Sequence, residues 1–166
     1  MEEKIKIYES DYLAYELMPD TNIEFVSKEF IYIEELVKNE SEWESCPEWL
    51  EYLSDRPIGN KPNKANLNMA EFCNFLLDNN LSKIQEIEII ADERGAYADK
   101  IKTSEIFGNS IYAVVFSGQN DTVEQLCIIP LEQDDIIIVG QFGTLVKFIL
   151  DKYNFIIVNW NDRKIN

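Results

Sequence analysis

The sequence predicts a single α+β domain in which an N-terminal helical region precedes a mostly antiparallel sheet. Three observations predict this class. The chain of 166 residues is 46% hydrophobic and 12% aromatic, as expected for a globular domain with its own core. Apolar residues recur at helical spacing in the first half, whereas β-branched runs joined by short turns dominate from residue 83 onward. We expect residues 1–166 to form one domain.

The N-terminal third combines short extended runs with one helix. Residues 4–8 and 22–26 are β-branched or alternating, which predicts short strands. Residues 27–39 are predicted to be helical, with Ser27 as the N-cap. The apolar residues that define the face of this helix recur at helical spacing and are Phe30, Ile33 and Val37.

A second, short helix and a loop follow. Ser45 and Glu48 form the pattern of a capping box, and Pro47 is tolerated in a first helical turn, so residues 46–54 are predicted to be helical. Residues 55–66 contain two prolines, a glycine and three asparagines, which indicates a loop. This loop is a possible internal hinge and not a domain boundary.

The third predicted helix begins at another capping box. Asn68 and Glu71 have the required spacing, and the residues DNN at 78–80 end the helix. The apolar side chains of its buried face are Met69, Phe72, Cys73 and Leu76, which fall at positions i, i+3, i+4 and i+7.

The second half of the chain is predicted to build the sheet. Residues 83–93 are β-branched, and three further runs joined by short turns form an antiparallel meander over residues 110–140, because such short connections cannot make parallel crossovers. The strands of this meander are 110–118, 122–129 and 135–140. A late helix over 143–153 and a final strand over 155–160 complete the prediction.

The start of the chain and its cysteines favour a cytoplasmic protein. Residues 1–12 lack the basic start and apolar stretch of a signal peptide, and no run of 18 apolar residues suggests a transmembrane helix. Cys46, Cys73 and Cys127 are odd in number and widely spaced, which matches neither a disulfide framework nor a zinc site. We expect all three to be buried or half-buried core residues.

The sequence offers no catalytic signature. There is no histidine, which removes the commonest general base, the common nucleophile arrangements and imidazole metal ligands. No phosphate-binding glycine motif is present, and the two glycines at 139–143 fit a plain strand–turn–helix joint. We expect no enzyme activity and no cofactor.

Carboxylate chemistry remains an alternative. A pair of acids could hydrolyse glycosides, but 31 acidic residues do not single out such a pair. Asp92, Glu93 and Asp99 surround Arg94 and could bind calcium, although their spacing differs from that of an EF-hand loop and also suits a solvated turn.

Charge points to the class of partner. The net charge of −16 disfavours nucleic acid and anionic membranes and favours encounter with a cationic partner. The acidity is uneven: residues 1–56 contain 16 acids and 5 bases, residues 57–82 are neutral, and residues 83–166 have a net charge of −5.

The acidic first third includes a segment rich in aromatic residues. Residues 40–55 contain six acids, two tryptophans and a tyrosine, and no Lys or Arg. In a helix over 46–54, Trp49, Leu50 and Leu53 would form the core side. Acids around exposed aromatics are typical of a surface that binds a basic protein. The predicted binding residues are Glu40, Glu42, Trp43, Glu44, Glu48, Glu51, Tyr52 and Asp55.

These features favour a non-catalytic binding protein for a basic toxin or nucleic-acid-handling enzyme. In size and charge the chain resembles bacterial immunity proteins and phage-encoded inhibitors, which are often small, acidic and cytoplasmic. Residues 135–153, DIIIVGQFGTLVKFILDKY, are similar to the strand-then-helix close of the SMI1/KNR4-type immunity domains. The alternatives are a structural domain whose acidity serves only solubility, and the carboxylate-dependent enzyme or calcium binder. The sequence does not specify an oligomeric state.

Overall fold

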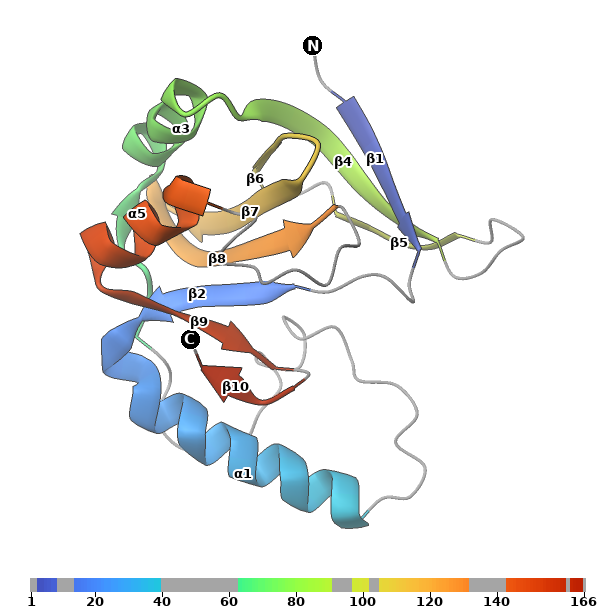
Figure 1. Ribbon diagram of the computed structural model, residues 1–166, viewed down its shortest axis with the longest axis vertical. Helices are drawn as coiled ribbons and strands as arrows, with labels where there is room; N and C mark the ends of the chain where they lie inside the picture. Colours follow the sequence, from blue (N-terminus) through green and yellow to red (C-terminus); the bar gives the residue numbers. More distant parts are fainter. Residues whose placement is uncertain are drawn as a thin grey trace.

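The computed structural model describes residues 3–8, 14–39, 63–90, 97–101, 105–131, 143–160 and 162–165. These residues form an α+β domain built on a sheet with helices on both faces (Figure 1). The described helices are α1 (Ile23–Asn39), α3 (Met69–Asp78) and α5 (Gly143–Tyr153), with a 3-10 turn η2 (Asp20–Asn22) before α1. None of them combines the length and apolarity needed to cross a bilayer.

The sheet follows the order β1-β4-β6-β7-β8-β2-β9-β10, with β5 pairing with β4 and β3 pairing with β8. Its strands are β1 (Glu3–Tyr8), β2 (Tyr15–Pro19), β3 (Leu67–Asn68), β4 (Ser82–Ile90), β5 (Tyr97–Ile101), β6 (Glu105–Gly108), β7 (Tyr112–Gln119), β8 (Thr122–Pro130), β9 (Phe155–Asn159) and β10 (Lys164–Ile165). Among the described pairs, only β1 with β4 is parallel. A mostly antiparallel sheet is therefore confirmed.

The predicted order of elements, with helices first, is wrong. β1 and β2 precede α1, and β2 lies inside the sheet between β8 and β9. The sequence YELMP of β2 has a charged residue at its second position and a proline at its end, so it resembles no strand locally. Pairing with strands more than a hundred residues later stabilises it, and such long-range pairing leaves no local pattern.

The first helix begins earlier than predicted. α1 starts at Ile23, so residues 22–26 are not a strand and Ser27 lies within the helix instead of capping it. Val26 and Ile33 are buried and Phe30 is half-buried, which gives an apolar face at i, i+4 and i+7 that packs on the sheet. This tertiary contact outweighs the alternating pattern of residues 22–26.

The later elements match the predictions more closely. α3 begins at Met69, and the Asn68 side chain accepts a hydrogen bond of 3.0 Å from the Glu71 backbone N–H, as a capping box requires. The late helix, the β7–β8 hairpin and the strand at 155–159 are confirmed, whereas β6 and β10 were not predicted. The predicted helix over 46–54, residues 55–62 of the loop and the strand over 135–140 lie outside the described residues.

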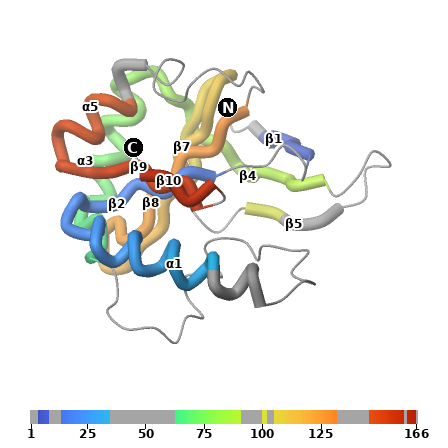
Figure 2. Tube along the Cα trace, turned by 60° about the horizontal axis from the view of Figure 1, so that its bottom comes forward, coloured from blue at the N-terminus to red at the C-terminus, as the bar shows by residue number. Residues whose placement is uncertain are grey.

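Each face of the sheet has its own core. α3 and α5 cover one face of the sheet (Figure 1). Alternate residues of β7, β8, β2 and β9 belong to the core that they share with these helices. On the opposite face, α1 covers β2, β9 and β10, and the strands β1 and β4 close over β6, β7 and β8 (Figure 2). Strand alternation accounts for this division, because neighbouring residues of one strand belong to different cores.

The β7–β8 hairpin provides a test of local geometry. Asn120 and Asp121 both have positive φ, at 52° and 62°, as a two-residue type I′ turn requires. A Cβ on Gly118 would overlap the carbonyl oxygen of Thr122 and lie 2.9 Å from the Cα of Val123. We expect Gly118→Ala to lower the free energy of unfolding by about 1–3 kcal/mol, measured by urea denaturation.

Gln119→Ala is the control, because Gln119 is the exposed neighbour of Gly118 in the same hairpin. We expect this change to stay within about 0.5 kcal/mol of the parent. Equal stabilities for the two variants would show that the backbone approach at Gly118 is not a constraint.

Candidate functional site

The eight predicted binding residues lie outside the described residues, so the binding-face prediction remains untested. The structure does define where the acidic segment is attached. α1 ends at Asn39, directly before Glu40, and the chain is described again from Asn63.

Asn63 is held at the start of α1 by a reciprocal amide pair. The Nδ2 of Asn22 donates to the Asn63 carbonyl at 2.8 Å, and the Asn63 backbone N–H donates to the Oδ1 of Asn22 at 2.7 Å. A third bond of 3.0 Å joins the Asn63 side chain to Thr21. A helix of 17 residues is about 25 Å long, so residues 40–62 connect two points about that far apart.

A second set of contacts fixes the chain after Asn63 against the β7–β8 hairpin. The pairing register places Glu124 in a bulge of β8, because Ser117 pairs with Gln125 and Gly118 pairs with Val123. The Glu124 carboxylate accepts from Lys64 at 2.9 Å, and its carbonyl accepts from the Ala65 backbone N–H at 3.4 Å. The point at which the chain is described again is therefore tied to the folded domain by these contacts, and Ala65 beside it is buried.

Asn22 is the residue whose loss should loosen this attachment. Asn22 is 2% exposed, so Asn22→Ala removes two part-buried hydrogen bonds and leaves the backbone N–H and C=O of Asn63 without this partner. We expect a loss of about 1–3 kcal/mol of unfolding free energy and faster tryptic cleavage after Lys64. Asn74→Ala, an exposed change on α3, is the control and should alter neither quantity; equal effects would show that the amide pair does not hold the segment.

A pocket of about 540 Å³ lies where the chain is described again, at Asn63. Its described lining joins the amides of Asn63 and Asn66 to the aromatic rings of Tyr153 and Phe155. The ammonium of Lys64, also in the lining, is bound to Glu124. The lining also includes the hydroxyl of Thr21 and the carboxylate of Glu71, so the pocket offers hydrogen-bonding groups, one carboxylate and two aromatic rings. Its described residues show no nucleophile hydrogen-bonded to a base.

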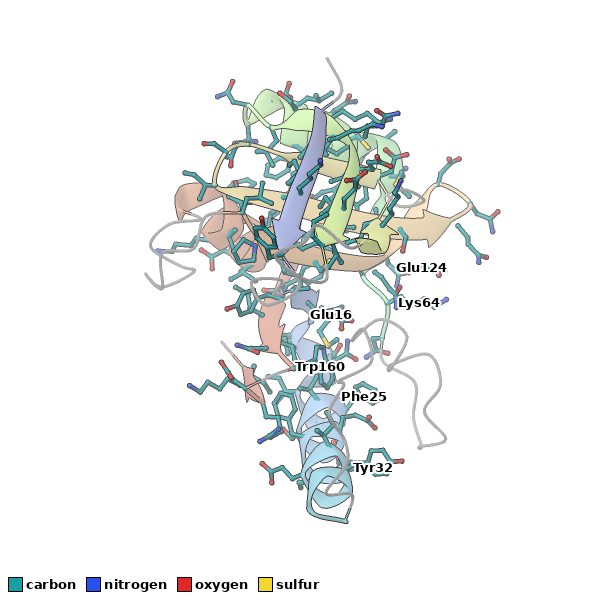
Figure 3. All side chains as sticks on the ribbon, turned by 90° about the vertical axis from the view of Figure 1, so that its right-hand side faces the viewer. Glu16, Phe25, Tyr32, Lys64, Glu124 and Trp160 are labelled. Carbon is teal, nitrogen blue, oxygen red and sulfur yellow. The ribbon has the colours of Figure 1, made fainter. Side chains whose placement is uncertain are left out.

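Buried charge lies on the other side of β2, under α1. Glu16 is 5% exposed, and its carboxylate accepts a hydrogen bond of 2.9 Å from the indole N–H of Trp160 (Figure 3). Phe30 of α1 meets the same indole ring edge-on, with centroids 5.4 Å apart. Sequence reasoning missed this pair, since no local pattern links residues so far apart.

The cysteine prediction is confirmed for the two cysteines that the structure describes. Cys127 is buried opposite Glu16 in the β2–β8 register, and Cys73 is half-buried on α3. Burial first, and then the Glu16 charge, raise the pKa of the Cys127 thiol well above its usual value. A thiol so strongly disfavoured as the thiolate is a core residue and not a nucleophile. Cys46 lies outside the described residues.

No group of three or more potential metal-ligating side chains occurs within the described ranges. Asp92, Glu93 and Arg94 lie outside these ranges, and Asp99 belongs to strand β5. Comparison with protein-family models, with curated proteins and with solved structures found no match.

Proposed function

We propose that this chain is a cytoplasmic, non-catalytic binding protein that covers a basic surface of another protein. A toxin or a nucleic-acid-handling enzyme is the natural target, because the binding sites of such proteins are cationic. The role is that of a bacterial immunity protein or a phage-encoded inhibitor. The proposed binding face comprises Glu40, Glu42, Trp43, Glu44, Glu48, Glu51, Tyr52 and Asp55.

The distribution of charge carries this proposal. The described residues contain 17 acids and 11 bases, a net charge of −6, whereas the remaining residues contain 14 acids and 4 bases, a net charge of −10. The second group includes residues 40–55, which have six acids and no base. Acidity is therefore concentrated where it is least neutralised within the chain, which favours fast encounter with a cation-rich partner.

Ion pairs within the described residues support the same conclusion. Six of the eleven bases there form ion pairs with carboxylates of the described residues, so each of these six neutralises an acid beside it. The pairs are Lys4–Glu86, Lys28–Glu24, Lys64–Glu124, Lys83–Glu105, Lys100–Glu88 and Arg163–Glu34. Exposed pairs of this kind add little stability, and their main effect is on the surface potential.

The first experiment is co-purification of the tagged protein at low and at high salt, with mass spectrometry of the bound proteins. Co-expression with the product of the adjacent gene is included as bait. We expect a stoichiometric basic partner that is released as salt rises, because screening weakens attraction between exposed charges. Absence of any partner at both salt concentrations contradicts the proposal.

The second experiment tests the face itself. We expect the triple change Trp43→Ala, Glu44→Gln and Glu48→Gln to weaken binding of that partner about 30-fold or more, since loss of a tryptophan hot spot alone costs about 2 kcal/mol. The affinity is measured by isothermal titration calorimetry at two salt concentrations.

A control variant removes the same number of acids as the triple change and one exposed apolar side chain from helices α3 and α5, which the structure describes. Its changes are Leu77→Ala, Asp78→Asn and Asp151→Asn. We expect this control to bind within about threefold of the parent, because its effect is limited to screened long-range charge. If both triple variants bind like the parent, the binding face is not residues 40–55.

A further inference from the structure

Strand β1 is paired along one edge, and its other edge pairs with no strand among the described residues. It pairs in parallel with β4 over its whole length, from Glu3 with Ile84 to Tyr8 with Ile90. Within the described ranges, no other strand pairs with it, and in Figure 3 it lies at the front of the molecule with β4 on one side. Every second residue of β1 therefore directs its N–H and C=O away from β4, as in any edge strand.

The outer surface of this part of the sheet has charges that alternate from strand to strand. Lys4 and Lys6 of β1 lie opposite Glu86 and Glu88 of β4, and Glu88 in turn lies opposite Lys100 of β5. Ammonium and carboxylate are 3.2 Å apart in the Lys4–Glu86 pair. The distance is 3.7 Å in the Lys100–Glu88 pair. The order of charge across the three strands is positive, negative, positive.

Ile5 and Ile7 point to the other side of β1. Ile7 is 8% exposed and belongs to the core that β1 and β4 close, and Ile5 packs against the same core. The strand thus has lysines on the face toward solvent and isoleucines on the face toward the core. A strand added beside it would place its own side chains next to the lysines on one face and next to the isoleucines on the other. That strand would continue the alternation only if its solvent face were acidic and its other face apolar.

We propose that the open edge of β1 is a strand-addition site for an extended segment of another protein that has acidic residues at alternate positions and apolar residues between them. Backbone hydrogen bonds to the open edge supply affinity, and side chains at alternate positions supply selectivity. Lys4 and Lys6 select carboxylates by cross-strand attraction, as Lys4 does toward Glu86 in the ion pair on the β4 side. This site is separate from residues 40–55 and does not depend on the function proposed for them.

A second copy of the chain is a poor occupant of the same edge. Two β1 strands that pair antiparallel with matching faces place Lys4 opposite Lys6, Lys4 opposite Lys4, or Lys6 opposite Lys6. Like charges directly opposite each other destabilise a sheet, and registers that mismatch the two faces place lysine opposite isoleucine. The register with Ile7 opposite Ile7 avoids both, but it pairs only residues 6–8 of β1. The lysines thus disfavour the longer self-pairings while they favour an acidic strand.

The negative charge of the whole protein does not prevent such binding near physiological salt. The Debye length is about 8 Å at 0.15 M, so distant acids are screened while lysines beside the bound strand are not. We therefore expect binding to an acidic strand at this salt concentration.

The test uses a capped, dye-labelled octapeptide of alternating glutamate and valine at 0.15 M salt. We expect saturable binding by fluorescence anisotropy, and NMR shift changes centred on the backbone amides of β1. The same peptide methylated at every second backbone nitrogen, and a peptide of alternating lysine and valine, should not bind. Equal binding of either control peptide, or shifts centred elsewhere, overturns the proposal, as does the absence of saturation at millimolar peptide.

Paired variants of the full-length protein complete the test. Lys6→Glu reverses the charge of a β1 side chain that lies opposite Glu88 of β4. Lys147→Glu makes the same change at an exposed position on α5. We expect the first to weaken peptide binding about fivefold or more and the second to change it less than twofold. Lys6→Gln, a milder change, should give an intermediate loss if Lys6→Glu disturbs the fold. Equal affinities for all three variants overturn the proposal, and so does a dimer of the free protein with protected β1 amides.

Discussion

Replacement of Phe116 by alanine is expected to lower the free energy of unfolding by about 3–5 kcal/mol. Phe116 is 1% exposed at the centre of the face that α3 covers. Its ring meets Phe72 of α3 edge-on at 5.0 Å and stacks on Phe107 of β6 at 5.9 Å. Alanine would leave a cavity bounded by two rigid rings, which cannot collapse easily, so both the transfer and the cavity terms contribute.

Urea denaturation measures this change, with Phe148→Ala as the matched control. Phe148 is 49% exposed on α5 and stacks on Phe75 at 5.3 Å, so the same truncation should cost only about 1 kcal/mol. Phe116→Leu keeps most of the volume and should cost less than about 1.5 kcal/mol, which keeps the test informative if the alanine variant is largely unfolded. Equal costs for Phe116→Ala and Phe148→Ala would contradict the described packing.

The second large effect is expected at the buried pair of Glu16 and Trp160. Trp160→Phe keeps an aromatic ring against Phe30 but removes the N–H that donates to the Glu16 carboxylate. Loss of a hydrogen-bond donor to a buried carboxylate costs about 1–3 kcal/mol. We therefore expect the free energy of unfolding to fall by about that amount. The same urea experiment measures it.

A double-mutant cycle with Glu16→Gln isolates the pair. The neutral amide needs the indole N–H less than the carboxylate does, so Trp160→Phe should cost less in the Glu16→Gln background than in the parent. The expected coupling is at least about 0.5 kcal/mol. Strict additivity of the two changes would show that the buried carboxylate does not rely on Trp160.

The elements that the sequence predicted well are those whose stabilising contacts are local. The helix over 69–78 has its cap, its first turn and its apolar face within a dozen residues, and the structure places its N-cap at Asn68. The hairpin at Asn120 and Asp121 follows from residues that tolerate positive φ. In both, a local pattern and the tertiary structure favour the same conformation.

For the candidate site, the sequence identifies the composition of the segment, and the structure identifies how the segment is anchored. The acidity and the aromatic content of residues 40–55 are properties of composition, so the sequence alone identifies them and the hypothesis of a basic partner. The anchor consists of two hydrogen bonds between the Asn22 side chain and the backbone of Asn63, 41 positions away. No pattern in the sequence predicts this contact. The role of the eight predicted binding residues stays a prediction.

By itself, the sequence determined the α+β class, three helices of the described fold, the hairpin and the unequal distribution of charge. Only the tertiary structure decided that β2 lies inside the sheet, that α1 begins at Ile23, and that β1 pairs in parallel with β4 with Lys4 and Lys6 opposite Glu86 and Glu88. The physical reason is the range of the interactions. Helix caps, turns and net charge depend on neighbouring residues or on sums over the chain. Strand order, register and buried pairs such as Glu16 with Trp160 instead depend on contacts that form only when distant segments meet.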